Sequence, residues 1–187
     1  MIDRANSPHL TLAKKFWRAH LTPSDFVIDM TCGNGYDTQF IAELVPEGQV
    51  FSVDIQECAL EKARALVGPL ERVRFFHQSH IEPLPHSRAP KLIVYNLGYL
   101  PGGDKRLTTM ANTTLASVNK ASELLGDGGA LSIACYPGHE EGFIEEQTLI
   151  DWAINLPYNQ WHVSLHQWIN RKRSPSLLWI TKPGRFN

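Results

Sequence analysis

The order of strand-like and helix-like runs is the feature that most restricts the fold of this chain. Short apolar runs rich in β-branched residues alternate with longer runs that have the spacing of an amphipathic helix. This alternation predicts a parallel sheet covered by helices on both faces. The predicted strands are residues 26–31, 49–54, 73–76, 92–95 and 130–135, and the predicted helices are residues 37–45, 57–67, 108–125 and 140–155.

The last part of the chain breaks this alternation. Two strand-like runs, residues 161–169 and 177–181, are separated by only seven residues, which is too short for a crossover helix, so the two runs must pair antiparallel. The expected fold class is therefore α/β, a Rossmann-like seven-stranded, mostly parallel sheet with helices on both faces and a C-terminal antiparallel β-hairpin. This layout resembles the class I S-adenosylmethionine (SAM) methyltransferase fold, whereas a dehydrogenase fold lacks the hairpin.

Length and composition are typical of one soluble globular domain. The chain has 187 residues, of which 43% are hydrophobic and 20% are charged, and no apolar stretch reaches 18 residues. We expect a single domain over residues 1–187, in which the first 22 residues form a helical cover over the cofactor site. The N-terminus lacks the pattern of a signal peptide, so we expect a cytoplasmic protein with no membrane partner.

Cysteine and charge distribution restrict the partners. Cys32, Cys58 and Cys135 lack the spacing of metal ligands, which predicts reduced thiols and no metal site. The formal net charge is −1, but residues 152–187 contain no Asp or Glu and five Lys or Arg residues, which points to an anionic partner at one edge of the molecule. Four of the five tryptophans are expected in the core or at the contact of a homodimer. They are Trp152, Trp161, Trp168 and Trp179.

The turn after the first strand has the pattern of a site where the backbone approaches a ligand. Gly33 and Gly35 remove side chains that would block this approach. Asp54 ends the second strand 19 positions after Gly35, where a carboxylate accepts hydrogen bonds from ribose hydroxyls. By spacing alone the ligand is NAD or SAM. In a purely structural alternative, the glycines only make a tight turn and Asp37 only caps a helix.

Two details favour SAM over NAD. Thr38 stands where a dinucleotide fingerprint has its third glycine, and Asp37 would repel a pyrophosphate at the helix N-terminus. Asp29 and Asp37 form an acidic rim that suits a sulfonium and an amino group. The segment after the third strand falls where an adenine would lie, and Gln78 or Ser79 can bond the base. The predicted cofactor-binding residues are Asp29, Thr31, Gly33, Asn34, Gly35, Asp37, Thr38, Asp54, Ile55, Gln78, Ser79, His80 and Asn96.

Residues 96–105, NLGYLPGGDK, leave the fourth strand and carry the spacing Asn-x-x-Tyr. Methyltransferases that modify exocyclic amines have Asn/Asp-Pro-Pro-Tyr at this place, and Gly98 replaces one proline here. In such a motif the Asn carbonyl orients the amine and the aromatic ring of Tyr99 stacks on the base. The alternative is a loop that merely turns the chain.

The segment Tyr136-Pro-Gly-His139 follows the fifth strand and opens on the same face as Asn96. His139 either accepts the proton that the amine loses or caps the following helix through contacts with Glu140 and Glu141. The predicted catalytic residues are thus Asn96, Tyr99 and His139. Lys105 either contacts phosphate or is solvated, and the hairpin tip is expected to contact RNA phosphates. The predicted substrate-binding residues are Leu97, Gly98, Pro101, Gly102, Lys105, Arg171, Lys172 and Arg173.

Three blocks, residues 29–38, 96–105 and 136–142, together resemble the rRNA methylase family of class I SAM-dependent methyltransferases. The resemblance implies SAM as cofactor and tRNA as partner, because characterised members methylate the aminomethyl group of 5-aminomethyl-2-thiouridine at the wobble position. An rRNA or small-molecule N-methyltransferase is an alternative within the same fold. An NAD-binding oxidoreductase and a non-catalytic SAM-binding, RNA-binding protein are the alternatives from other classes.

Overall fold

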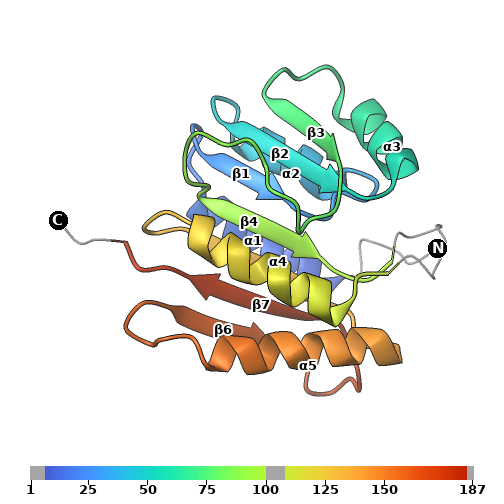
Figure 1. The fold of residues 1–187 in the computed structure, drawn as a ribbon, viewed down its shortest axis with the longest axis vertical. Coiled ribbons are helices and arrows are strands. Elements are labelled where there is room, and N and C mark those ends of the chain that lie inside the picture. The colour runs from blue at the N-terminus through green and yellow to red at the C-terminus, as the bar shows by residue number, and fades with distance from the viewer. Residues whose placement is uncertain (1–6, 100–107, 185–187) are drawn as a thin grey trace.

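The computed structural model describes residues 7–99 and 108–184. Its centre is a twisted seven-stranded sheet of order β3-β2-β1-β4-β5-β7-β6 (Figure 1). The first five strands pair in parallel, and β7 pairs antiparallel with both β5 and β6, which confirms the expected fold class. The strands are β1 (Phe26–Asp29), β2 (Gln49–Asp54), β3 (Val73–His77), β4 (Leu92–Asn96), β5 (Ala130–Cys135), β6 (His162–His166) and β7 (Ser176–Thr181).

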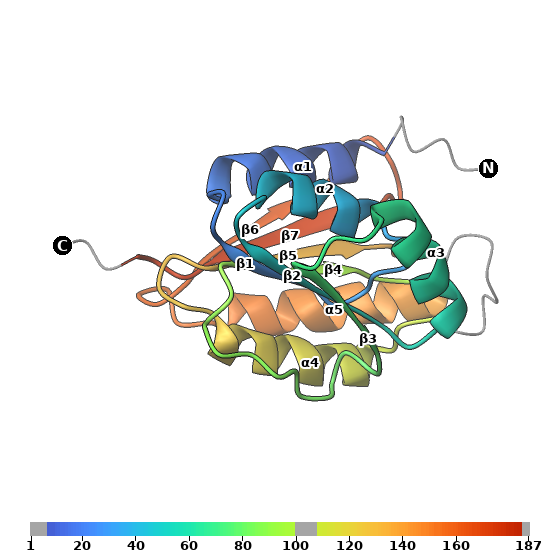
Figure 2. The same cartoon turned by 90° about the horizontal axis from the view of Figure 1, so that it is seen from above.

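Helices cover both faces of the sheet (Figure 2). On one face lie α1 (Pro8–His20), α2 (Tyr36–Leu44) and α3 (Glu57–Val67), and on the other face lie α4 (Ala111–Leu124) and α5 (Glu140–Ile154). Because both faces are covered, β1 and β5 are buried along their whole length, as expected for parallel strands in an α/β sheet. None of the helices in the described part of the chain is long and apolar enough to cross a membrane.

The first helix connects the sheet face with the carboxyl edge of the sheet. Trp17 is buried, and its indole N–H donates to the Ser132 hydroxyl of β5 at 2.9 Å. Nearer the N-terminus of α1, the Lys14 ammonium lies 3.4 Å from the Asp37 carboxylate, and His9 Nε2 lies 2.9 Å from the Tyr136 hydroxyl. The helix therefore lies on the face of β5 and β7, and its first turns reach the edge where the parallel strands end.

Several element boundaries differ from those expected from the sequence. The first strand ends at Asp29, and β6 is shorter than the apolar run that contains it. The helix expected from residue 108 begins at Ala111, because the two preceding threonines have another role. Thr108 pairs with Tyr99 in an isolated antiparallel bridge, and the Thr109 hydroxyl accepts the N–H of Gly98 at 2.8 Å. These threonines hold the segment after β4 in place.

Candidate cofactor and substrate site

The carboxyl ends of the five parallel strands meet at one edge of the sheet, which is where open α/β sheets bind ligands. Asp29, Asp54 and Asn96 end β1, β2 and β4 at this edge. The structure thus gathers three of the residues that the sequence singled out, although they are 25 or more positions apart in the chain.

The turn between β1 and α2 depends on its two glycines. Gly33 and Gly35 have φ of 53° and 83°, a region that favours glycine over other residues. A Cβ on Gly35 would also lie 2.7 Å from Ala63 Cα in α3, so the turn packs directly on that helix. Between the glycines, the buried Oδ1 of Asn34 has no hydrogen-bond partner within the described residues. Such a backbone-lined turn with an unused acceptor fits a ligand that carries hydrogen-bond donors.

Asp54 is fixed by the backbone around it. One carboxylate oxygen accepts the Gly33 N–H at 2.7 Å, and the other accepts the Gln56 N–H at 2.9 Å. A carboxylate has about four acceptor positions, so each oxygen retains capacity for one more donor. The side chain is only partly buried. This arrangement suits the two hydroxyls of a ribose, as expected for the adenosine part of SAM.

Asp29 and Thr38 lie behind the turn. The Thr38 hydroxyl is 2.6 Å from an Asp29 oxygen and 2.7 Å from the Ser52 hydroxyl, and the other Asp29 oxygen accepts the Thr31 N–H. The Asp29 side chain is buried, with 1% of its surface exposed. Burial raises the pKa of Asp29 to about 7, and the nearby carboxylates of Asp37 and Asp54 act in the same direction. Both side chains thus brace the turn, and their direct contact with cofactor stays a prediction.

The Asn96 side chain is oriented by Asp37. Its Nδ2 donates to an Asp37 oxygen at 3.1 Å, and its backbone N–H donates to the Thr31 hydroxyl at 2.6 Å. The other Asp37 oxygen faces the Lys14 ammonium. A carboxylate can only accept hydrogen bonds, so the amide nitrogen of Asn96 faces Asp37 and the carbonyl oxygen faces away from it. The carbonyl is then the end of the amide available to a donor on a substrate.

The segment after β4 is held by a carboxylate that the sequence analysis missed. Gly98, with φ of 101°, donates its N–H to the Thr109 hydroxyl, and its carbonyl accepts the Thr109 N–H. The Thr109 hydroxyl donates in turn to Glu145 of α5 at 2.8 Å, and Thr114 donates to the other Glu145 oxygen at 2.6 Å. Glu145 is 2% exposed, and burial raises its pKa. In the sequence Glu145 is one of four acids within seven residues, so no signal distinguished it from solvated neighbours.

His139 caps α5. Its Nδ1 accepts the N–H of Gly142 at 3.1 Å, which assigns the ring proton of the neutral imidazole to Nε2. Its ring lies 6.1 Å from that of Tyr99, measured between centroids. His139 thus caps the helix, through Gly142 rather than through Glu140 and Glu141, and its catalytic role stays a prediction. In this tautomer Nε2 is a donor, so a role as proton acceptor requires the cap bond to break.

The residues expected near the adenine lie after β3. Gln78 donates to the Pro83 carbonyl, and the backbone N–H of Ser79 donates to Glu82. His80 keeps a buried Nδ1 without a hydrogen-bond partner among the described residues, and burial lowers the pKa of its ring. A neutral ring with an unused nitrogen at this edge is better suited to bind an adenine than to bind a charged ligand. Ile55, which follows β2, is 65% exposed, and its carbonyl oxygen lies 3.0 Å from His77 Nε2 at the end of β3.

The predicted substrate-binding residues fall into three groups. Leu97 packs in the core with 4% of its surface exposed, whereas Gly98 lies beside Tyr136 at the open edge. Pro101, Gly102 and Lys105 lie outside the described residues. The third group, residues 171–173, is exposed in the loop between β6 and β7. Within residues 7–99 and 108–184, no cluster of His, Cys, Asp or Glu could hold a metal ion, and the three cysteines are free.

Comparison with known proteins identifies relatives of the whole chain. Residues 50–182 match the family described as "Putative rRNA methylase". The chloroplastic tRNA (mnm(5)s(2)U34)-methyltransferase of Arabidopsis thaliana is 33% identical over 186 residues, which cover 91% of this chain and 68% of that protein.

Solved structures agree with this relationship. A protein of Clostridium thermocellum, described as a putative rRNA-methylase, superposes with a TM-score of 0.88 at 31% identity, over 93% of this chain and 97% of the other. SMU.1697c of Streptococcus mutans, described as a putative methyltransferase and solved in complex with SAH, superposes with a TM-score of 0.84 at 30% identity, over 97% and 99% of the two chains.

Proposed function

Because this chain belongs to the rRNA methylase family and is a SAM-dependent methyltransferase, we propose that it methylates tRNA, on the aminomethyl group of 5-aminomethyl-2-thiouridine at the wobble position. The name of the Arabidopsis relative, a tRNA (mnm(5)s(2)U34)-methyltransferase, supports this choice of substrate. The chemistry of the candidate site gives independent support, since it suits a neutral primary amine.

The orientation of Asn96 is the observation on which the proposal rests. SAM supplies an electrophilic methyl group, so the chain has to bind a neutral amine and direct its lone pair. The Asn96 carbonyl, turned away from Asp37, accepts one N–H of that amine and thereby restricts the direction of its lone pair. The Tyr99 ring is suited to stack on the pyrimidine that carries the amine.

The methylated amine has to release one proton. The His139 ring lies 6.1 Å from the Tyr99 ring, but its Nδ1 accepts the Gly142 N–H, which leaves the ring proton on Nε2. Water is therefore the simpler proton acceptor. His139 then stabilises the N-terminus of α5, and the site accelerates the reaction by positioning the amine rather than by base catalysis.

Mass spectrometry of nucleosides tests the proposed substrate. The protein is incubated with SAM and with tRNA that lacks the terminal methyl group, and the tRNA is then digested. We expect 5-aminomethyl-2-thiouridine to be converted to 5-methylaminomethyl-2-thiouridine, and an Asn96→Ala variant to convert it about 10²-fold or more slowly. Methyl transfer to rRNA but not to this tRNA would contradict the proposal.

A further inference from the structure

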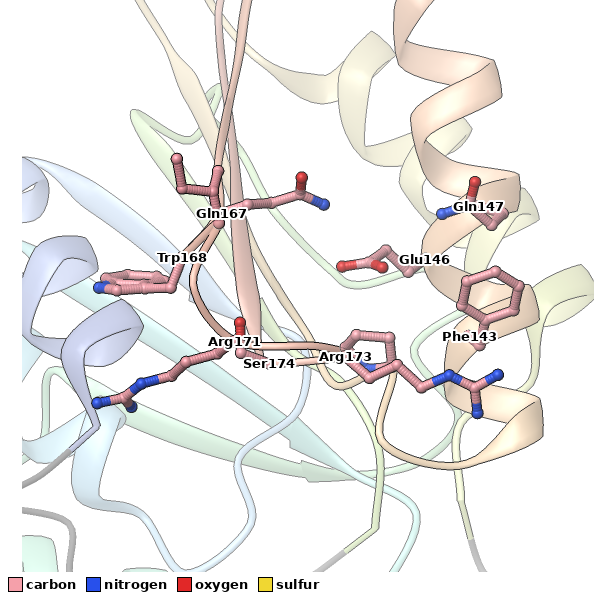
Figure 3. A pocket seen from close by; sticks show the side chains of 10 residues that line it. Phe143, Glu146, Gln147, Gln167, Trp168, Arg171, Arg173 and Ser174 are labelled. Carbon is pink, nitrogen blue, oxygen red and sulfur yellow. The ribbon is translucent and has the colours of Figure 1, made fainter.

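A second pocket lies outside the candidate site, between α5 and the loop that joins β6 to β7 (Figure 3). Its volume is about 240 Å³. The side chains around it come from both segments: Phe143, Glu146 and Gln147 from α5, and Gln167, Trp168 and Arg171 from the loop. The pocket is therefore built by two segments that are about 20 positions apart in the sequence.

The pocket opens at the same edge of the sheet as the candidate site. Ser176, where the loop enters β7, pairs with Cys135 at the carboxyl end of β5. Pro137, which also lines the pocket, belongs to the short connection between β5 and α5 that carries His139. One connection thus borders both sites.

The lining combines flat rings with amide groups. Trp168 is only partly buried, so it lies outside the core, which was one of the two places that the sequence suggested for it. Gln147 and Gln167 are exposed and provide donors and acceptors on two sides of the space. The volume is below the roughly 300–1,000 Å³ of pockets for drug-sized ligands, so it suits one small planar group. Aromatic rings and amides are the groups with which proteins hold unstacked RNA bases.

Charges are arranged in layers from the floor to the rim. Glu146 is 4% exposed, accepts the Ser176 hydroxyl and directs its carboxyl group into the space between Trp168 and Phe143. The cationic side chains lie at the rim, where Arg173 stacks over the Phe143 ring at 5.2 Å and Arg171 extends outward. An acid at the floor disfavours a phosphate there but accepts hydrogen bonds from the amino group of a base. The layering therefore predicts that a base enters and its phosphate stays at the rim.

We propose that this pocket binds one unpaired nucleotide of the RNA substrate, other than the nucleotide that is methylated, with its base against Trp168 and its phosphate near Arg171. The inference rests on the proposed function, because it requires an RNA substrate. It adds a binding subsite that fixes the register of the RNA relative to Asn96. A base with an amino group, such as cytosine or adenine, matches the Glu146 acceptor best.

Trp168→Ala tests the subsite, and Tyr158→Ala is its matched control. Tyr158 is also an aromatic residue near α5, but it is 90% exposed and does not line the pocket. The probe is a fluorescein-labelled anticodon stem-loop RNA, and binding is followed by anisotropy without turnover. We expect Trp168→Ala to bind the probe about tenfold or more weakly, in line with the loss of one stacked base, and Tyr158→Ala to bind it as the wild type does. SAM binding, measured by calorimetry, should be equal in all three proteins.

Two further variants separate the contribution of the base from that of the phosphate. Trp168→Tyr retains a ring, so it should recover most of the affinity, and it also serves if Trp168→Ala fails to fold. Arg171→Ala should lower the slope of log affinity against log salt by about 0.7, the value for one contact to single-stranded phosphate. Trp168→Ala should leave that slope unchanged.

The outcomes keep the two proposals apart. If the wild type methylates tRNA but Trp168→Ala binds the probe as well as Tyr158→Ala does, the subsite is wrong and the proposed function stands. The same result would follow if the pocket served a protein partner. If the wild type neither methylates tRNA nor binds the probe, the proposed function fails, and the subsite fails with it.

Discussion

At the scale of single residues, one hydrogen bond decides which end of an amide is offered to the substrate. Asp37 accepts a hydrogen bond from the amide nitrogen of Asn96, so the amide oxygen remains available to the substrate. The same contact explains why an amide rather than a carboxylate suits position 96. A carboxylate there would face Asp37 at hydrogen-bonding distance, and two like charges so close disfavour each other.

Asn96→Ala should therefore impair chemistry more than binding. An interaction realised mainly in the reactive geometry lowers the barrier without tightening the ground state, and loss of one such contact reduces the rate by about 10²-fold or more. Single-turnover methyl transfer at saturating SAM and tRNA measures this rate, and SAM and tRNA affinities should change little. Asn96→Asp should also be slow, because of its repulsion with Asp37. A wild-type rate in the Asn96→Ala variant would show that Asn96 has only a structural role in the turn.

The buried carboxyl of Asp29 predicts a pH dependence of stability. Its pKa is raised to about 7 in the folded state, above the ordinary value of 3.8. Between these two pH values the folded state retains a proton that the unfolded state has released, so this group lowers stability as the pH rises. The slope reaches at most about 1.4 kcal/mol per pH unit for one proton.

Asp29→Asn removes that titration. The free energy of unfolding of the variant, relative to the wild type, should rise from about pH 4 to pH 7 and be constant below that range. Urea denaturation at a series of pH values measures the difference, and titrating groups that do not interact with Asp29 cancel because both proteins contain them. Parallel pH profiles for the two proteins would show that Asp29 is ionised throughout.

At the scale of elements, α5 does more than cover the sheet. Glu145 fixes Thr109, and Thr109 fixes the backbone of Gly98 beside the candidate site. The position of the segment after β4 thus depends on the carboxyl group of Glu145, which belongs to α5 and is buried against α4. The helix start at Ala111 has the same cause, since Thr108 and Thr109 contact the segment after β4 instead of extending the helix.

Thr109→Val should loosen this segment while keeping its shape. The variant leaves the Gly98 N–H and Glu145 without a hydroxyl partner, which lowers the free energy of unfolding by about 1–3 kcal/mol. We also expect a higher KM for tRNA, because the proposed substrate contacts lie on the same segment. Thr113→Val is the control, since the Thr113 hydroxyl makes only an exposed bond to the Met110 carbonyl. Equal stability of the two variants would argue against the Glu145 network.

The sequence predicted the elements well where periodicity and glycine chemistry are local signals. The alternation of strands and helices, the antiparallel end and the turn around Gly33 and Gly35 all follow from residues close together in the chain. The residues that surround the candidate site and the pocket could not be predicted from such local signals. Glu145 and Trp168 look like an ordinary helix acid and a core aromatic, and only the packing of α5 against α4 and against the β6–β7 loop gives them their surroundings.

At the scale of the whole molecule, cofactor binding should be visible as stability. A ligand that binds only the folded state stabilises it by about 2.7 kcal/mol at 100 times its Kd. Saturating SAM should therefore raise the Tm of the wild type, and Asp54→Ala should lose most of that shift. Comparison of Tm with and without SAM within each protein separates this effect from the loss of the Gly33 and Gln56 backbone bonds to Asp54. NADH is the control ligand, and a shift with NADH alone would contradict the SAM site.

The insertion of β7 between β5 and β6 has a consequence for how the protein is made. β7 is the last of the described strands to leave the ribosome, yet it is an interior strand of the sheet. Until it emerges, the β5 edge has no neighbour on that side, and β6 has no strand with which to pair. A nascent chain that has completed its cofactor turn and its first five strands thus still presents an open sheet edge, which is a template for association with other chains. Ribosome pausing before β7 would therefore prolong the state most exposed to aggregation.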